Sequence, residues 1–355
     1  MSILKFAIIG YGNIGKRHAH HILHHTDAVL KAVCEVPLFD KPDNFPEGVS
    51  LYDDIERMLV QEDIDIVNVC TPNYLHHPHT LMALTYNKHV VCEKPMALRT
   101  SECDEMIQCA EERNRSVFVV KQNRFNEPVQ QVKKLIENNQ LGKVFLVNVN
   151  CFWNRNEYYY QESAWRGKKT QDGGCLFTQF SHFVDILYYL FGDIQDCNGM
   201  LNNFSHPYIE IEDNGIFIMK TGCGAMVNFN FSTCSHEKNM EGAFTIIAAH
   251  GTVKIGGQYL NTIEYQNIKH VTLPEINIQA KSNDYGKYQG SMSNHDKMID
   301  NVVRTLQGKE TIMTRDEIIP SWFLRTSLNS RNNVLNETAT QTIFHWPESM
   351  TKRRS

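Results

Sequence analysis

The sequence predicts two domains: an α/β domain with a parallel sheet over residues 1–123, and an α+β domain with a large, mostly antiparallel open sheet over residues 124–355. In the first part, short β-rich apolar runs alternate with helical stretches, which is the pattern of a doubly wound parallel sheet. From Gly142 onward the chain carries long β-rich runs separated by short turns. With 355 residues, 42% of them hydrophobic, the chain is long and apolar enough for two cores.

The chain opens with a β-rich apolar run, Leu4 to Ile9, followed by a glycine-rich turn and a helical stretch to about His25. The turn reads Gly-x-Gly-x-x-Gly, in which the first glycine makes the tight turn, the second admits a pyrophosphate and the third allows close helix packing. A phosphate would then sit on the amino end of the helix. This strand, turn and helix predict a Rossmann-type dinucleotide site formed by Gly10, Gly12, Asn13, Ile14 and Gly15.

A second strand, Val29 to Cys34, ends in Glu35, twenty residues after Gly15. A carboxylate at this place can accept hydrogen bonds from the ribose hydroxyls of adenosine and would repel a 2′-phosphate. The sequence therefore favours NAD over NADP as the cofactor.

The first helix carries five histidines, some of them spaced i, i+4 as in metal sites. No nearby set of carboxylates or cysteines completes such a site, so a solvated helix face is favoured and no metal is predicted. The histidines are His18, His20, His21, His24 and His25.

Three later strands of the first domain end in polar clusters, and open α/β sheets bind ligands at the carboxyl ends of their strands. The strand from Asp65 to Cys70 is followed by Thr71, Pro72, Asn73 and His76, and the strand from His89 to Cys92 by Glu93, Lys94 and Pro95. The strand from Val117 to Val120 precedes Gln122. Because proline cannot continue a strand, Pro95 stops the fourth strand and holds Lys94 at its end. We expect a cis bond before Pro95.

Composition excludes several classes of protein. The formal net charge of -5 and the lack of a clustered basic face argue against a nucleic-acid partner. The first residues run directly into a strand without a signal pattern, and no apolar run approaches the roughly eighteen residues of a membrane helix. Ten scattered cysteines never form Cys-x-x-Cys. A soluble, cytoplasmic protein with no membrane partner is expected.

The glycine motif, the Thr71-Pro72 and Glu93-Lys94-Pro95 turns, and the downstream Gly173-Gly174 and His182 together resemble the glucose-fructose oxidoreductase, inositol dehydrogenase and MocA (Gfo/Idh/MocA) family. The resemblance covers nearly the whole chain. One branch, the UDP-N-acetylglucosaminuronate 3-dehydrogenases of the WlbA and WbpB type, is closely similar at several segments. These are Val119 to Arg124, Val147 to Asn150, Phe152-Trp153, Tyr158-Tyr159, Trp165 to Gly167, Asp172 to Gly174 and Ser181-His182.

The resemblance implies oxidation of a nucleotide-linked sugar at C3 by tightly held NAD, in the biosynthesis of surface polysaccharides. It also implies that Gln122, Asn123 and Arg124 contact the nicotinamide ribose and the sugar, and that the enzyme is a homotetramer. An exposed open sheet face independently predicts a homo-oligomer, a dimer or tetramer. At one position the chain departs from the family, which usually has aspartate or asparagine four residues before the histidine, whereas this chain has Thr178. We interpret Thr178 as a positioning residue.

A helix predicted from about Leu176 to Phe191 places Thr178, His182 and Asp185 on one face. Oxidation of a secondary alcohol needs a base for the hydroxyl proton, and a histidine is a suitable acceptor at neutral pH. Lys94 would bond the same oxygen, or, with a lowered pKa, would itself be the base. Both residues are predicted to be catalytic, with the order left open.

Further substrate and cofactor contacts are predicted in a polar-aromatic loop that suits a carboxylate or diphosphate. Its residues are Tyr158, Tyr159, Trp165 and Arg166, and aromatics there could equally serve subunit packing. His295 opens a late helix, Asp296 to Leu306, that would return across the site. A last helix near Ile318 to Asn329, with Pro320 in its first turn, would pack on the first domain. The stretch from Asn267 to Gln289 is either a substrate-covering loop or a surface excursion.

The preferred hypothesis is therefore an NAD-dependent sugar dehydrogenase acting on a nucleotide-linked hexuronate. A dehydrogenase of a free polyol or aldose is the first alternative. A regulatory protein that binds NAD without turnover and a scaffold in a polysaccharide pathway are the others.

Overall fold

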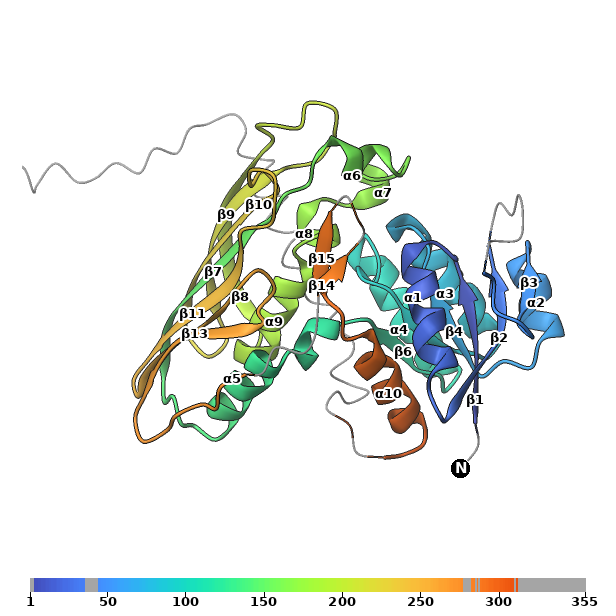
Figure 1. Cartoon of the computed structure of the whole chain (residues 1–355), viewed down its shortest axis with the longest axis horizontal. Coiled ribbons are helices and arrows are strands. Elements are labelled where there is room, and N and C mark those ends of the chain that lie inside the picture. Colours follow the sequence, from blue (N-terminus) through green and yellow to red (C-terminus); the bar gives the residue numbers. More distant parts are fainter. Residues whose placement is uncertain are drawn as a thin grey trace, which may run out of the picture.

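The computed structural model describes residues 3–35, 44–276, 282–284, 286, 288–309 and 311. Two large sheets dominate it, one in each half of the chain, with helices between them (Figure 1). The first sheet and its helices form the α/β part, and the second sheet lies across the other end of the molecule. The predicted domain boundary after residue 123 falls inside the short 3-10 helix η2 (Gln122–Phe125).

The first sheet has six strands in the order β3-β2-β1-β4-β5-β6, and all five pairings are parallel. Its strands are almost entirely buried, as expected for a parallel sheet covered on both faces. The predicted doubly wound architecture is therefore confirmed. The edge strand β3 was not predicted, because three residues are too few to show a periodic pattern. The strands are β1 (Leu4–Ile9), β2 (Ala28–Cys34), β3 (Ser50–Tyr52), β4 (Ile66–Val69), β5 (His89–Cys92) and β6 (Val117–Val119).

Helices connect these strands, as the sequence predicted. The amino end of α2 is capped by a side chain: the carboxylate of Asp54 accepts a hydrogen bond from the N–H of Arg57 at 2.6 Å. The helices are α1 (Asn13–Leu23), α2 (Ile55–Gln61), α3 (His76–Thr85) and α4 (Thr100–Glu112), with the 3-10 helix η1 (Asn73–Leu75) before α3.

The second sheet has seven strands in the order β13-β12-β11-β7-β10-β9-β8. Only the β7–β10 pair is parallel, so the prediction of a mostly antiparallel sheet is confirmed. The outer strands β8 and β13 were not predicted, because both are rich in polar residues and neither is fully buried. The strands are β7 (Val144–Phe152), β8 (Ile194–Asn202), β9 (Asn214–Thr221), β10 (Met226–Ser232), β11 (Glu241–Ala248), β12 (Gly251–Gly256) and β13 (Thr262–Ile268).

The helix predicted from Leu176 to Phe191 is broken in two, which corrects the sequence-based expectation. The N–H groups of Gln179 and Phe180 both bond the carbonyl of Cys175, at 2.9 Å each, and this bifurcation interrupts the helical ladder. The result is a short α8 (Cys175–Thr178) and a buried α9 (Ser181–Phe191). Thr178 and His182 therefore do not share one helix face.

The remaining helices lie between the sheets or at their edges (Figure 1). The amphipathic α5 was not predicted, although apolar residues recur along it at helical spacing. The described part of the Asn267 to Gln289 stretch contributes to the small hairpin of β14 (Ser282–Asp284) and β15 (Gln289–Met292). The helices are α5 (Glu127–Glu137), α6 (Glu157–Gln161), α7 (Lys169–Asp172) and α10 (His295–Leu306).

Helix α9 packs on the inner face of the second sheet, where Phe183 stacks on Phe244 of β11. Among the described residues, no helix covers the outer face (Figure 1). That face exposes apolar side chains on four strands, beside a polar row that includes Asn148 and Asn228. The apolar side chains are Leu146 on β7, Met200 on β8, Ile216 and Ile218 on β9, and Met226 on β10.

Helix α10 packs against α1, so the late part of the chain returns to the first domain. The further helix predicted near Ile318 to Asn329, with Pro320, lies outside the described residues. The predicted solvated face of α1 is wrong for His18, which is buried with 1% of its surface exposed. No helix in the described part of the chain is long and apolar enough to cross a membrane.

Candidate active site

The glycine turn has the conformation that the sequence predicted. Gly10 has a φ of +89°, and a Cβ there would lie 2.8 Å from the carbonyl oxygen of Cys70. A Cβ on Gly15 would overlap the Gly10 carbonyl, so both positions require glycine. Nothing lies within 4 Å of a Cβ built on Gly12, which leaves its backbone open to a ligand. This cradle therefore fits the pyrophosphate of a dinucleotide.

A cleft of about 760 Å³ runs from this turn along the carboxyl ends of the first strands, and we call it the cofactor cleft. Glu35 lies in it, after β2, and its carboxylate accepts a hydrogen bond from the N–H of Tyr11. The predicted cofactor residues that line the cleft are Gly10, Gly12, Asn13, Ile14, Glu35, Thr71, Pro72, Trp165 and Arg166.

Changing Glu35 to alanine is expected to weaken NAD binding about tenfold and to relax the preference for NAD over NADP by a similar factor. The reason is the loss of charge-assisted hydrogen bonds to the ribose and of repulsion toward a 2′-phosphate. Dissociation constants for NADH and NADPH, measured by fluorescence titration, check both effects. An unchanged preference would place the ribose contact elsewhere.

A second, smaller cavity of about 170 Å³ adjoins the cofactor cleft, and we call it the inner cavity. Both spaces are lined by Ile14, Thr71, Trp165, Arg166 and Tyr288, which shows that they are contiguous. The predicted catalytic residues Lys94 and His182 both line the inner cavity. The structure thus brings together two residues that are 88 positions apart in the sequence.

Lys94 follows β5, and its peptide bond to Pro95 is cis, as predicted. Its Nζ donates a hydrogen bond to the carbonyl oxygen of Thr178 at 2.7 Å. Burial lowers the pKa of Lys94 from its ordinary value. The ammonium is therefore anchored at one hydrogen and has others to offer to a ligand.

His182 lies near the start of α9, with 3% of its surface exposed. Burial, together with the charges of Lys94 and Lys121, holds the pKa of His182 well below its ordinary value. Its Nε2 lies 3.4 Å from Nε2 of Gln122 and 3.5 Å from Oγ of Ser291, and its Nδ1 has no hydrogen-bonding partner among the described residues. A neutral imidazole in this place can accept a proton.

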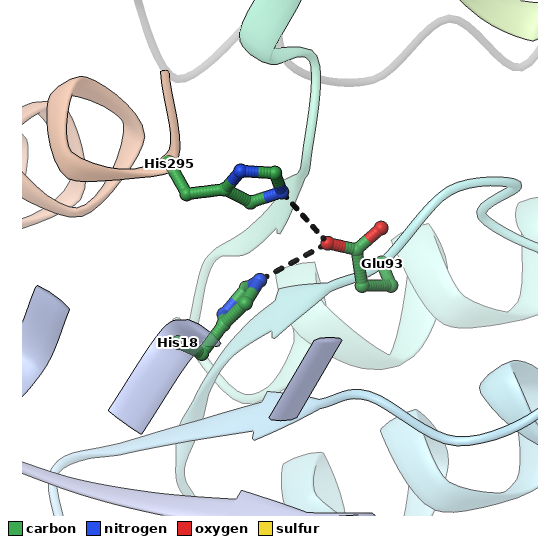
Figure 2. Close-up of side chains that lie close together, drawn as sticks. All are labelled: His18, Glu93 and His295. Carbon is green, nitrogen blue, oxygen red and sulfur yellow. Dashed lines mark hydrogen bonds and ion pairs between the residues drawn. The ribbon is translucent and has the colours of Figure 1, made fainter. Parts of the chain in front are cut away.

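Behind Lys94, the carboxylate of Glu93 lies between two histidines from opposite ends of the chain (Figure 2). Its Oε1 is 3.0 Å from Nε2 of His18 and 3.6 Å from Nε2 of His295, and all three residues are buried. Burial alone would raise the pKa of Glu93, but the two histidines outweigh it and hold that pKa well below its usual range. Oε2 of Glu93 accepts from the N–H of Lys94 at 3.1 Å, so the cluster fixes the turn that carries the lysine.

In the described part of the chain, two groups of side chains have ligand atoms close enough to hold a metal ion. The first is the Glu93 cluster, which is accounted for by hydrogen bonds: Asn68 donates to Nδ1 of His18 at 2.8 Å, which leaves the Nε2 proton for Glu93. The second consists of His206, Asp213 and Cys234. There, His206 bonds Asp213 at 2.9 Å and the carbonyl of Arg155 at 2.8 Å, a structural role.

Thr178 lines the inner cavity and is hydrogen-bonded to a nearby carboxylate. Its hydroxyl donates to Asp172 and accepts from Nδ2 of Asn73 at 2.9 Å. Burial raises the pKa of Asp172. Thr178 thus contacts Asn73 through its side chain and Lys94 through its main-chain carbonyl, contacts that agree with the predicted positioning role without testing it.

Other predicted residues divide into two groups. Tyr159, Trp165, Arg166 and His295 line the inner cavity, as do Asn73, His76, Glu93 and Gln122. Tyr158 is 60% exposed and lines neither space. Asn123 and Arg124 are buried outside both spaces, and the guanidinium of Arg124 makes two hydrogen bonds of 2.8 Å to Asp185. The structure does not place these last three residues where a ligand in either space would contact them.

Several lining residues were not predicted from the sequence. They are Trp153, Arg155, Gln179, Asn283, Tyr288, Gly290 and Ser291. The first two follow β7 in a Trp-x-Arg pair, the only signal that could have identified them. Asn283 and Tyr288 come from the polar stretch whose role was left open, and Gly290 and Ser291 follow it in β15. That stretch contributes directly to the wall of the inner cavity.

Comparison with known families covers both domains. Residues 4–121 match the oxidoreductase family with an NAD-binding Rossmann fold, and residues 129–254 match the Gfo/Idh/MocA C-terminal domain. Among curated proteins, D-glucoside 3-dehydrogenase from Escherichia coli (strain K12) is 32% identical over 194 residues, 54% of this chain and 55% of the relative. The chain spans about half the length of the curated relatives it matches.

Two solved structures are similar over nearly the whole chain. The WlbA dehydrogenase from Chromobacterium violaceum, in complex with NADH and UDP-GlcNAcA, is 30% identical, with a TM-score of 0.79 and coverage of 94% of this chain and 95% of that chain. The WlbA dehydrogenase from Bordetella pertussis, with the same two ligands, is 30% identical, with a TM-score of 0.78 and coverage of 93% and 97%. The chain therefore belongs to the Gfo/Idh/MocA family of NAD-binding oxidoreductases.

Proposed function

We propose that the protein is an NAD-dependent dehydrogenase that oxidises the C3 hydroxyl of a nucleotide-linked sugar, UDP-N-acetylglucosaminuronate. The observation that carries this proposal is the convergence of Lys94 and His182 on an inner cavity contiguous with the cofactor cleft. A secondary alcohol in that cavity would meet a proton acceptor and a hydrogen-bond donor at one oxygen. The WlbA structures, which contain NADH and UDP-GlcNAcA, support the choice of substrate.

The roles of the two residues follow from their protonation. NAD, when bound in the cofactor cleft, supplies the hydride acceptor. His182, neutral because its pKa is lowered, accepts the hydroxyl proton, while the ammonium of Lys94 donates a hydrogen bond to the developing alkoxide. The reverse assignment, with a neutral Lys94 as the base, is the second possibility, because burial also lowers the pKa of Lys94.

The proposed function is tested by incubating the purified protein with UDP-N-acetylglucosaminuronate, NAD and 2-oxoglutarate. We expect NADH or, if the cofactor is recycled in place, 2-hydroxyglutarate. The absence of both products would contradict the proposal. It would also favour the hypothesis of a regulatory protein or scaffold, provided that NADH titration still shows binding.

A dehydrogenase of a free sugar is the second candidate, favoured by the similarity to D-glucoside 3-dehydrogenase. The same assay with methyl glucoside, glucose and inositol separates the two. Turnover of a free sugar at a kcat/KM equal to or above that of the UDP-sugar would replace the first proposal by the second.

We also propose that the apolar outer face of the second sheet binds a second copy of the chain, forming a dimer or tetramer. Exposed apolar patches of this kind mark association surfaces. Light scattering after size exclusion is expected to give a multiple of the 41.0 kDa chain mass. Changing both Ile216 and Ile218 to lysine is expected to shift the protein toward the monomer. A wild-type protein that is already monomeric would contradict the proposal.

We further propose a cytoplasmic location and a role in surface-polysaccharide biosynthesis. The ten cysteines, all of them free, support a reducing compartment. The sugar acid bound by the WlbA relatives supports the pathway. Fractionation of the native cell and the polysaccharide composition of a deletion strain would test these two statements.

A further inference from the structure

Arg155 is a wall residue of the inner cavity that the sequence did not single out. It lies just beyond β7, next to the isolated bridge between Asn154 and Cys234, and its side chain enters the cavity wall between the two domains. Only 2% of its surface is exposed. Arginine is rarely buried to this degree without an acidic partner.

Within the described part of the chain, the side-chain hydrogen bonds of Arg155 go to neutral acceptors. Its Nε donates to Oε1 of Gln179 at 2.7 Å, and its Nη1 donates to the carbonyl of Asn154 at 2.6 Å and to Oδ1 of Asn239 at 3.3 Å. Among the described residues it makes no ion pair, and burial lowers its pKa. The contrast is Arg124, equally buried but paired with Asp185.

Aromatic rings surround the guanidinium. Its central carbon lies 5.0 Å from the ring centre of Trp153, 5.3 Å from that of Tyr159 and 5.5 Å from that of Tyr288. These rings hold the guanidinium in place and exclude water from it. This buried cation has no carboxylate partner among the described residues. Such a group is a site for an anion that a ligand brings.

Arg155 is linked to Lys94 through two consecutive residues. Lys94 bonds the carbonyl of Thr178, and the next residue, Gln179, holds Arg155. An anion bound by Arg155 would therefore lie on the side of the inner cavity that carries Lys94, where the proposed function places the sugar. Arg166, the other arginine of the cavity wall, already has a carboxylate partner, Glu162, at 2.7 Å.

We infer that Arg155 binds the carboxylate of the sugar acid and thereby selects the acid over the neutral sugar, an inference that rests on the proposed function. No hydrogen bond among the described residues uses Nη2 of Arg155, so this group can donate charge-assisted hydrogen bonds to a carboxylate, whereas a primary alcohol at the same carbon carries no charge to match them. A diphosphate has the same anionic chemistry, so the two sources must be separated by experiment.

The experiment compares UDP-N-acetylglucosaminuronate with UDP-N-acetylglucosamine, which differ at this position alone. For the unchanged protein, kcat/KM for the acid is expected to exceed that for the neutral sugar by about 100-fold. In Arg155→Gln this ratio is expected to fall to within about threefold of unity, because only the acid loses a contact. A ratio that stays unchanged in Arg155→Gln would overturn the inference. If kcat/KM at the same time falls equally with both sugars, that loss would assign Arg155 to the diphosphate.

Arg166→Gln is the matched control, because it removes the same charge from the same cavity wall. Its rates are expected to fall by similar factors with both sugars, which leaves the ratio unchanged.

If Arg155→Gln fails to fold, as judged by its melting temperature and NADH binding, two further tests remain. Arg155→Lys is expected to lower the ratio about tenfold, because an ammonium keeps the charge but cannot both bond Gln179 and occupy the position of Nη2. The unchanged protein is also expected to bind UDP-glucuronate more tightly than UDP-glucose, and equal affinities would overturn the inference.

Failure of the inference and failure of the proposed function have different signatures. If the unchanged protein neither binds nor oxidises either UDP-sugar, the proposed function is wrong and the inference falls with it. If it oxidises the acid but shows no preference over the neutral sugar, only the role of Arg155 is wrong.

Discussion

Replacing Lys94 by alanine is expected to lower kcat by about 100-fold or more while NAD binding is retained, on the usual scale of general acid-base and electrostatic catalysis. Lys94 lines the inner cavity, and its Nζ is anchored at 2.7 Å on the carbonyl of Thr178. Without it, the negative charge that develops on the substrate oxygen has no ammonium to stabilise it. Steady-state kinetics with the UDP-sugar and a titration with NADH measure the two properties separately.

His182→Ala is expected to cause a loss of similar size, because the other two histidines of the cavity wall are engaged elsewhere: His76 bonds the carbonyls of Pro95 and Thr71, and His295 contacts Glu93. Near-full activity of either variant would remove that residue from the mechanism. Lys88→Ala is the matched control for the lysine, because Lys88 also donates to a main-chain carbonyl, that of Ile64 at 2.8 Å, but lines neither space. It is expected to keep its activity.

The pH dependence of kcat/KM distinguishes the two possible bases. A base works when it is deprotonated, and His182, whose pKa lies well below 6.5, stays deprotonated down to acid pH. If His182 is the base, the acid limb of the profile falls well below pH 6.5, and activity declines on the alkaline side as Lys94 loses its proton below pH 10.5. If neutral Lys94 is the base, activity instead rises through the pKa of Lys94 as the pH increases.

Replacing Arg124 by alanine is expected to lower the free energy of unfolding by about 3–5 kcal/mol, the cost of leaving one charge of a buried pair without its partner. Arg124 and Asp185 have side chains that are 1% and 2% exposed, and two hydrogen bonds of 2.8 Å join them. Lys121, 3.8 Å from Asp185, is too far to replace either bond. Urea unfolding followed by circular dichroism measures the change.

Two further variants make this result specific. Arg57→Ala, which breaks an exposed pair with Asp53, is expected to cost about 0.5 kcal/mol or less. Replacing Arg124 by methionine together with Asp185 by leucine is expected to recover much of the lost stability, since no buried charge is left unpaired. A stable Arg124→Ala protein with a raised KM would instead support the substrate contact that the family resemblance implied.

The parts of the fold that the sequence predicted are those determined by local patterns. The strands β1, β2, β4, β5 and β6 are short, largely apolar runs, and the turn at Gly10 needs a backbone conformation that glycine alone adopts without strain. Lys94 and His182 were identified from local signals together with the family resemblance: a proline directly after Lys94 at the end of a strand, and a pair of glycines before the helix predicted to carry His182.

The remaining parts depend on contacts between residues far apart in the sequence. The guanidinium of Arg155 is held by hydrogen bonds to Gln179 and Asn239, which lie 24 and 84 residues away in the sequence. No local sequence pattern predicts contacts between residues so far apart. The burial of His18 likewise depends on Glu93, 75 residues later. The break between α8 and α9 falls at Gln179 and Phe180, inside a strong helical pattern, and Gln179 bonds the distant Arg155.

The cluster of His18, Glu93 and His295 also sets an order in which the site can be completed during synthesis of the chain. Domains fold from the amino end as the chain emerges, so the first sheet and its lysine are in place before the last contributor to the cluster exists. His295 is made some two hundred residues after Glu93. A nascent chain can therefore form the first sheet and its glycine turn early, yet its catalytic turn acquires its full set of supports only when α10 has docked on α1.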